Sequence, residues 1–152
     1  QSLFARNILD EKNGPPPEIN LFNEKNNGLT ILNLISNKLV NSVHDVSSGG
    51  ILVTLSEMSI QNKIGALIKL PKNNIKMHEY LFGEDQSRYI IEVDEKNMKK
   101  VSKILKDNNI YFEKFGITQK SFIEIKDILK ADLNVLEKLH KYWFNSYFNE
   151  NI

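Results

Sequence analysis

The stretch His44-Asp45-Val46-Ser47-Ser48-Gly49-Gly50 decides the fold of this chain. The segment that ends in it, residues 39–46, is short and contains three valines, which is typical of a strand. Residues 50–62, which follow it, have apolar side chains at helical spacing. The two glycines allow a tight connection between the two segments. The sequence therefore predicts a strand, a glycine turn and a helix that begins within two residues of Gly49.

Apolar spacing on both sides of this stretch predicts further helices and strands. Helices are expected at residues 3–9, 23–37, 50–62, 77–82, 94–108 and 133–148. Strands are expected at residues 39–46, 65–70, 88–93, 111–118 and 121–125, the last two as a terminal hairpin. The order indicates an α+β fold with a mixed, largely antiparallel sheet and packed helices. A run of three prolines predicts a linker, so residues 1–22 are expected to be a helix with a Pro-rich linker and residues 23–152 the domain.

Length and composition bound the class of protein. The chain has 152 residues, of which 41% are hydrophobic and 26% charged, as expected for one compact domain. It has no cysteine, which excludes disulfides and thiolate zinc sites and fits a reducing cytoplasm. A net charge of +1 gives no basic surface for nucleic acid, and no apolar stretch approaches the roughly 20 residues that span a membrane. Because the chain opens on Gln, we expect it to be part of a longer polypeptide.

The turn before the predicted helix 50–62 is the first candidate site. A helix N-terminus carries partial positive charge and backbone N–H donors that suit a phosphate. The candidate phosphate- or nucleotide-binding residues are Ser47, Ser48, Gly49 and Gly50. The alternative is that the glycines only make a tight turn, and the pattern alone favours this alternative. His44 and Asp45 are neighbours on the strand end, so their side chains are expected to point to opposite faces and not to form an acid and base pair.

The polar loop at residues 83–88 is the second candidate. Its carboxylates, Glu84 and Asp85, could hold Mg²⁺, and Arg88 could form two parallel hydrogen bonds with a phosphate. We count Glu84, Gln86 and Arg88, with His44 and Asp45, as candidate cleft residues. The alternative is a solvated turn before a strand.

Other polar and aromatic residues give weaker signals. The three histidines share no metal-ligand spacing, and no catalytic nucleophile can be argued from residue order, so no metal ligand or catalytic residue is assigned. The lysines of residues 96–103 predict a solvated helix face. Five aromatic residues between 142 and 148 exceed what one helix face needs. Some are expected to cover the domain's own sheet and the rest to dock against other parts of the parent chain.

The motifs together resemble a known family. Residues 44–52 are similar to the His-Asp-Val-Ser-Asp-Gly-Gly-Leu signature of the phosphoribosylformylglycinamidine synthase family. The resemblance continues, in order, through Gln1-Ser2-Leu3, Gly14-Pro15-Pro16-Pro17, Ile64-Gly65-Ala66, Leu81 to Tyr89, Phe115-Gly116-Ile117-Thr118 and Trp143. It covers essentially the whole chain. It implies the fold of the C-terminal domain that this family shares with aminoimidazole ribonucleotide synthetase.

The resemblance also implies a function. The family converts formylglycinamide ribonucleotide to its amidine in purine biosynthesis, with ATP, Mg²⁺ and ammonia from glutamine, in the cytoplasm. Implied partners are the ATP-binding domains of the same polypeptide, a glutaminase subunit and a small accessory subunit. These 152 residues are expected to be inactive alone.

One position departs from the family signature, and two other functions remain open. Ser48 stands where the family has Asp, and a hydroxyl binds Mg²⁺ poorly, but phosphate contact through backbone donors survives the change. With the resemblance, phosphate contact at residues 47–50 is preferred over the turn alone. The alternatives are a non-catalytic phosphate- or nucleotide-binding module and an interdomain interaction module.

Overall fold

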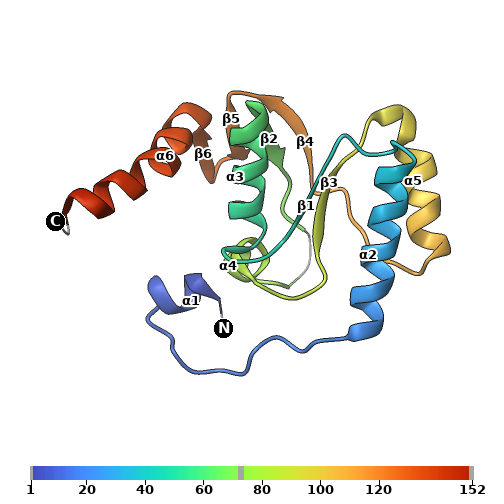
Figure 1. The fold of residues 1–152 in the computed structure, drawn as a ribbon, viewed down its shortest axis with the longest axis horizontal. Helices are drawn as coiled ribbons and strands as arrows, with labels where there is room; N and C mark the ends of the chain where they lie inside the picture. Colours follow the sequence, from blue (N-terminus) through green and yellow to red (C-terminus); the bar gives the residue numbers. More distant parts are fainter. Residues whose placement is uncertain (1, 72–73, 151–152) are drawn as a thin grey trace. The chain divides into compact units, whose positions relative to one another are not determined.

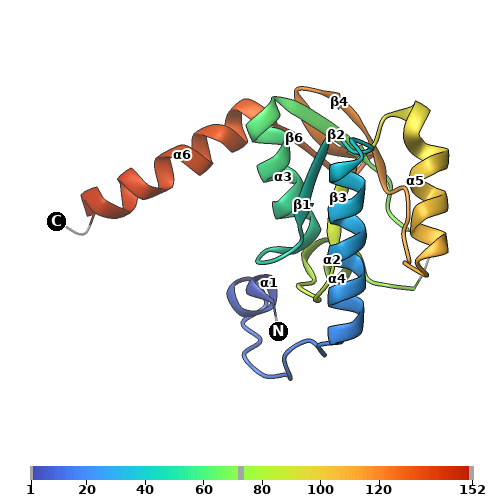
Figure 2. The ribbon, with the colours of Figure 1, turned by 45° about the vertical axis from the view of Figure 1, so that its right-hand side comes forward.

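The computed structural model describes residues 2–71 and 74–150, so Gln1 of the family resemblance lies outside the described residues. The chain forms two compact units, residues 1–54 with 75–114 and residues 55–74 with 115–152. One helix, α3 (Gly50–Asn62), contributes residues to both units. Figures 1 and 2 show the ribbon in two views.

The first unit combines helices with a two-stranded antiparallel sheet. Its helices are α1 (Leu3–Asn7), α2 (Leu21–Ser36), α4 (Met77–Phe82) and α5 (Glu95–Asp107). Its strands are β1 (Ser42–Asp45) and β3 (Tyr89–Glu92), with Val43 opposite Ile91. Side-chain oxygens of Ser2 and Asn20 accept hydrogen bonds from the first turns of α1 and α2, which explains where these helices begin.

The core of the first unit forms between α2 and α5. Helix α5 presents Val101 and Leu105, which are buried, and α2 presents Leu34, which is fully buried. Leu39 completes this cluster just after α2 ends. The apolar residues of α5 recur at helical spacing while its lysines remain on the outer face, so burial of this stripe fixes the helix against α2.

The second unit is a four-stranded mixed sheet. Its strands are β2 (Ile64–Ile68), β4 (Gly116–Lys120), β5 (Phe122–Ile125) and β6 (Leu129–Asp132), in the order β4-β2-β5-β6. Strand β2 pairs antiparallel with β4 and parallel with β5, and β5 pairs antiparallel with β6. The terminal hairpin predicted at residues 111–125 is therefore wrong, because β2 lies between β4 and β5. The hairpin forms one strand later, between β5 and β6.

The α+β class with a mixed, largely antiparallel arrangement is confirmed, although the strands divide between two sheets. The predicted helices at residues 50–62 and 77–82 have the observed bounds. Strand β6 was not predicted. No helix in the described part of the chain is long and apolar enough to cross a membrane.

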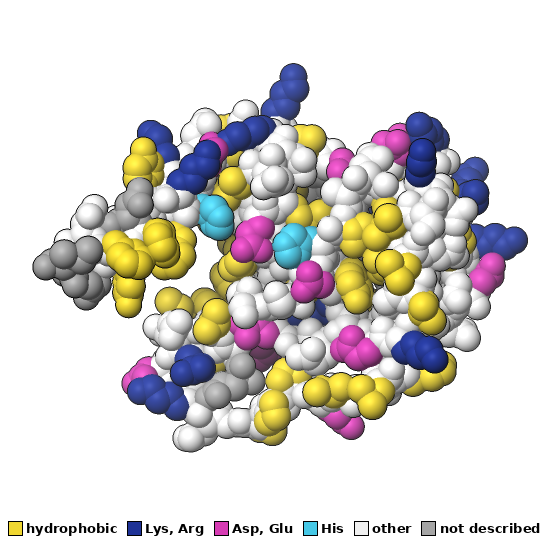
Figure 3. Space-filling view, viewed as in Figure 1, with side chains coloured by type: hydrophobic (Ala, Val, Ile, Leu, Met, Phe, Trp, Pro, Cys, Tyr) yellow, Lys and Arg dark blue, Asp and Glu magenta, His cyan; other side chains and the backbone are white. Residues whose placement is uncertain are grey.

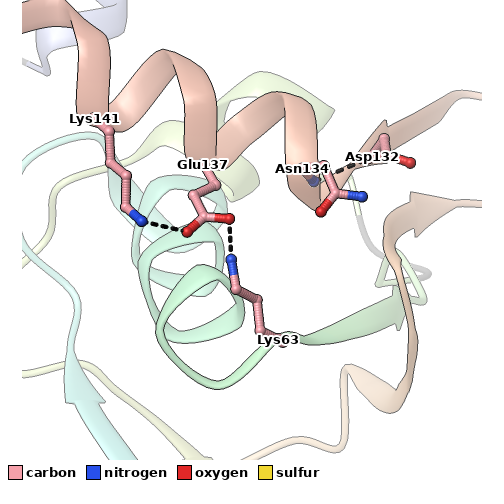
Figure 4. Close-up of polar contacts among 5 residues, drawn as sticks. All are labelled: Lys63, Asp132, Asn134, Glu137 and Lys141. Carbon is pink, nitrogen blue, oxygen red and sulfur yellow. Dashed lines mark hydrogen bonds and ion pairs between the residues drawn. The ribbon is translucent and has the colours of Figure 1, made fainter.

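The last helix, α6 (Leu133–Glu150), is attached to its unit at one end. Leu133 is buried, and the Glu137 carboxylate accepts hydrogen bonds from Lys63 and, at 2.6 Å, from Lys141 (Figure 4). The Lys141 hydrogen bond, followed by that of Lys63, lowers the pKa of Glu137 to about 2. Asp132 accepts a hydrogen bond from the backbone N–H of Asn134 and so caps the helix start.

Candidate functional site

The connection between β1 and α3 has the conformation that glycine favours. Gly49 and Gly50 have φ of +84° and +70°, and both are buried, whereas Ser47 and Ser48 are exposed. A Cβ on Gly50 would lie 2.7 Å from the backbone of Phe82 and Gly83. Two independent reasons, positive φ and close packing against the end of α4, therefore require glycine at position 50.

The backbone donors of this turn are largely used inside the chain. The N–H of Gly50 donates to the carbonyl of Ser47 at 3.1 Å. The N–H of Gly49 donates to Glu84 Oε1 at 2.8 Å. The expectation of free donors at both glycines is therefore wrong: one closes the turn and the other already binds an anionic group, the carboxylate of Glu84.

Glu84 holds two separate parts of the first unit. The same Oε1 atom that accepts from Gly49 also accepts from the N–H of Leu3 at 2.8 Å. These donors open α1 and precede α3, where the partial positive charge of a helix N-terminus stabilises a carboxylate. Glu84, predicted as a cleft residue that holds a cation, acts here as an acceptor for two backbone amides.

Arg88 folds back on its own loop. Its guanidinium donates to the carbonyl of Gly83 and, through Nε at 3.3 Å, to the carbonyl of Asp85. The side chain of Asp85 lies 3.7 Å from the same guanidinium. Arg88 therefore fixes the loop between α4 and β3, and these donors point inward to the loop carbonyls. Gln86 is exposed at the tip of this loop.

His44 and Asp45 are closer than strand alternation predicts. His44 Nδ1 lies 3.4 Å from Asp45 Oδ1 and 2.7 Å from the Asp45 carbonyl oxygen. The expectation that they point to opposite faces is wrong, because Asp45 is the last residue of β1 and the chain leaves the strand there. Thr54 Oγ1 of α3 lies at the limit of hydrogen bonding, 3.5 Å from the same carbonyl.

Sequence reasoning did not find two residues that complete this region. Phe4 of α1 stacks on Phe82 with ring centroids 4.5 Å apart and on His78 at 5.9 Å. The amide of Asn27 donates to both the carbonyl and the hydroxyl of Ser87, each at 3.0 Å. The apolar spacing of residues 3–9 predicts a helix, but no pattern names the partner of either side chain.

The α1 segment and the loop at residues 83–85 enclose a hollow of about 350 Å³. Acidic side chains dominate its polar lining: Glu11, Glu79, Glu84 and Asp85. Negative charge on this scale disfavours a phosphate inside it. Among residues 2–71 and 74–150, no three His, Asp or Glu side chains gather closely enough to hold a metal ion.

Known proteins resemble this chain at the level of both sequence and fold. Residues 1–125 match the family model described as AIR synthase related protein, C-terminal domain. The chain belongs to this family. The structure of this AIR synthase-related domain places the family-like motif at residues 44–52 at the junction of β1 and α3.

Curated relatives extend the likeness beyond the matched domain. The chain is 52% identical over 147 residues to phosphoribosylformylglycinamidine synthase subunit PurL of Pelagibacter ubique, which covers 97% of this chain and 20% of the relative. It is 36% identical over 150 residues to the same subunit of Bartonella quintana, covering 99% and 20%. The AIR synthase-related domain chain thus spans about a fifth of the length of these relatives.

Solved structures share the fold. Thermotoga maritima PurL complexed with FGAR has a TM-score of 0.72 and 17% identity, over 88% of this chain and 24% of that one. The same protein complexed with ATP has a TM-score of 0.65 and 16% identity, over 74% and 21%. At these identities the likeness shows the fold, which the resemblance in the sequence had implied.

Proposed function

We propose that the chain is the C-terminal domain of a phosphoribosylformylglycinamidine synthase of the PurL type. The complete polypeptide would convert formylglycinamide ribonucleotide to its amidine with ATP and glutamine-derived ammonia, in the cytoplasm. The observation that carries this proposal is 52% identity to Pelagibacter ubique PurL over 97% of the chain. The shared fold supports it. We retain residues 1–22 as an N-terminal arm and residues 23–152 as the domain.

The turn residues of this chain are suited to a supporting role in that reaction and not to binding the nucleotide alone. The amides of Gly49 and Gly50 are engaged, and a Ser48 hydroxyl is a poor Mg²⁺ ligand. These residues do not make a nucleotide or magnesium site by themselves. We propose that the remaining polypeptide holds ATP and Mg²⁺, and that a glutaminase subunit and a small accessory subunit supply ammonia. The description of the relatives as a subunit supports such partners.

The direct test uses the full-length polypeptide. Its gene is expected to restore growth without purines to a strain that lacks this synthase. The purified polypeptide, given ammonium chloride in place of glutamine, is expected to release ADP only when formylglycinamide ribonucleotide is present. Residues 1–152 alone are the matched control and should show no turnover. Failure of the full-length polypeptide in both assays, or turnover by the control, would contradict the proposal.

We further propose that residues 47–50 contact an anionic group once Glu84 withdraws from Gly49. The support is that the Gly49 N–H already donates a hydrogen bond to a carboxylate, that of Glu84, at 2.8 Å. In full-length protein, Glu84→Ala should tighten binding of inorganic phosphate several-fold. Glu79→Ala, which removes another carboxylate from the same acidic hollow, is the control for general charge. Equal phosphate binding by wild type and both variants would contradict this role.

One observation favours a second candidate function. Because Glu84 and Ser47 satisfy the donors of the glycines, the turn can also serve only to join the starts of α1 and α3 to the loop after α4, in a module that contacts no phosphate. This candidate predicts that Glu84→Ala leaves the KM values for ATP and formylglycinamide ribonucleotide unchanged and lowers thermal stability alone. The phosphate-contact role predicts a change in at least one KM.

A further inference from the structure

The last helix of the chain exposes many large apolar side chains. Helix α6 carries seven large hydrophobic side chains that are each 47–66% exposed. They are Val135, Leu139, Tyr142, Trp143, Phe144, Tyr147 and Phe148. We call this set the α6 face. Figure 3 shows hydrophobic side chains gathered along this helix.

The aromatic residues of the α6 face pack on one another. Trp143 and Phe144 meet edge to face with centroids 5.6 Å apart, and Phe144 and Phe148 lie 4.6 Å apart. In Figures 1 and 2 the C-terminal half of α6 runs away from the strands of its own unit. The expectation that some of these aromatic residues cover the domain's own sheet is therefore wrong, because the five aromatic side chains of residues 142–148 all remain exposed.

Hydrogen bonds in its first half hold α6 to its own unit. Glu137 and Lys141, four residues apart, lie on one side of the helix and bind each other, and Glu137 also binds Lys63 of the same unit (Figure 4). With 3.6 residues per turn, Trp143 lies well away from this polar side. This pair holds the first half of the helix. Phe144 and Phe148, seven and eleven residues after Glu137, continue the same side of α6 toward the C-terminus, whereas Trp143 lies on another side.

We propose that the α6 face docks into an apolar groove formed by the part of the same polypeptide outside these 152 residues. Soluble monomers rarely leave an apolar patch of this kind uncovered, and an amphipathic helix commonly fills such a groove. This inference rests on the proposal that the chain is one domain of a longer PurL-type polypeptide.

The extent of the matches argues for this occupant. The family model ends at residue 125, before α6 begins. The long relatives match 147 to 150 of the 152 residues, so most of α6 belongs to what they share with this chain. About four-fifths of the sequence of each relative lies outside the matched part, and the groove can lie there. Helix α6 therefore lies outside the family model and within the part of the chain that matches the long relatives.

The charge of α6 argues against a membrane as the occupant. Helices that lie on anionic membranes have polar faces rich in Lys and Arg. In the described part of α6 the lysines are Lys138 and Lys141, and Lys141 is paired with Glu137. This leaves little charge to attract a lipid surface.

The test is photo-crosslinking in full-length protein. We would introduce p-benzoylphenylalanine at Trp143, and at the exposed Lys100 of α5 as surface control, in a mixture of ¹⁴N- and ¹⁵N-labelled protein with anionic vesicles present. The expected result is a crosslink from position 143 to peptides outside residues 1–152 within one isotope class, at least fivefold stronger than from position 100. Mixed-isotope crosslinks would show a second copy, lipid crosslinks a membrane, and equal yields an uncovered face; each would overturn the proposal.

Hydrogen exchange of unmodified full-length protein keeps the inference testable if position 143 tolerates no replacement. Amides of residues 139–148 should exchange at least tenfold more slowly than expected for an uncovered, frayed helix end, and fast exchange would overturn the proposal. The same samples tested for growth restoration separate the two proposals. Active protein without the crosslink defeats this inference alone, and crosslinked but inactive protein defeats the proposed function alone.

Discussion

Two glutamates bind groups that are far from them in the sequence, and the two have different kinds of partner. Glu84 binds two backbone amides with one oxygen, at 2.8 Å each. Glu137 binds two lysine side chains, one with each oxygen. Both residues join segments far apart in the sequence, so both restrict the chain beyond their own element.

The difference lies in the donors. Amides of Leu3 and Gly49 belong to the backbone, so they lose no side-chain entropy on binding, and the part-buried amide of Gly49 loses its acceptor if Glu84 is removed. Side chains of Lys63 and Lys141 are 54% and 66% exposed, and water replaces Glu137 easily. Salt also screens charged pairs of this kind. We therefore expect the Glu84 region to be sensitive to substitution and the Glu137 region to be tolerant.

The largest effect is expected at Gly50, which packs against the end of α4. Gly50→Val should lower the free energy of unfolding by on the order of 3 kcal/mol, because a branched side chain meets positive φ and the backbone of Phe82 and Gly83. Urea denaturation followed by circular dichroism measures it. Gly14→Ala is the control for strain alone, since Gly14 also has positive φ but no neighbour within 4 Å. Gly14→Ala should lower the free energy of unfolding by about 1 kcal/mol. Equal losses for the two variants would contradict the role of packing at Gly50.

Removing the Glu84 carboxylate is expected to have the next largest effect. Glu84→Ala should lower the free energy of unfolding by about 2 kcal/mol, because two amides lose a charged acceptor. Glu84→Gln retains an oxygen acceptor and should lose about half as much. Asp85→Ala is the neighbouring control and should lose less than 1 kcal/mol, since its ion pair with Arg88 is exposed. If Asp85→Ala destabilises the chain as much as Glu84→Ala, the two amide hydrogen bonds do not account for the loss of stability.

The smallest effect is expected at Glu137 and depends on pH. Its pKa is lowered from 4.5 to about 2 in the folded chain, so the charged form stabilises the fold. That contribution is complete above pH 4.5 and is lost as the pH falls toward 2. The unfolding temperatures of wild type and Glu137→Gln should therefore differ slightly at pH 6 and become equal near pH 2. The ion-pair explanation would be contradicted if this difference grew on acidification or did not change in 0.5 M salt.

Helices and strands of this fold can be predicted from the sequence where a segment has a strong local pattern. The pair Gly49-Gly50 and the apolar spacing after it predict the helix Gly50–Asn62 with its observed bounds. The hairpin was misplaced because alternation along residues 111–125 says nothing about which strand pairs with which. Strand β6 was missed because it is four residues long and contains Lys130 and Asp132.

The candidate site was harder to predict than the fold. Residues 47–50 and the loop at residues 83–88 were both singled out, but their contact through Glu84 and Gly49 joins residues 35 apart in the chain. Sequence spacing carries no information on such a contact. The hydrogen bonds of Arg88 could not be predicted for a similar reason: its reach back to the carbonyls of Gly83 and Asp85 depends on the fold of the loop.

One carboxylate binds both Leu3 and Gly49, and amide NMR tests this most directly. In the ¹⁵N-labelled chain, Glu84→Gln should move the amide protons of Leu3 and Gly49 together to lower frequency, because both lose the charge of their shared acceptor, although they are 46 residues apart in the sequence. Asp85→Asn should leave both amide protons in place. Movement of only one of the two amides in Glu84→Gln, or equal movement of both in Asp85→Asn, would contradict this arrangement.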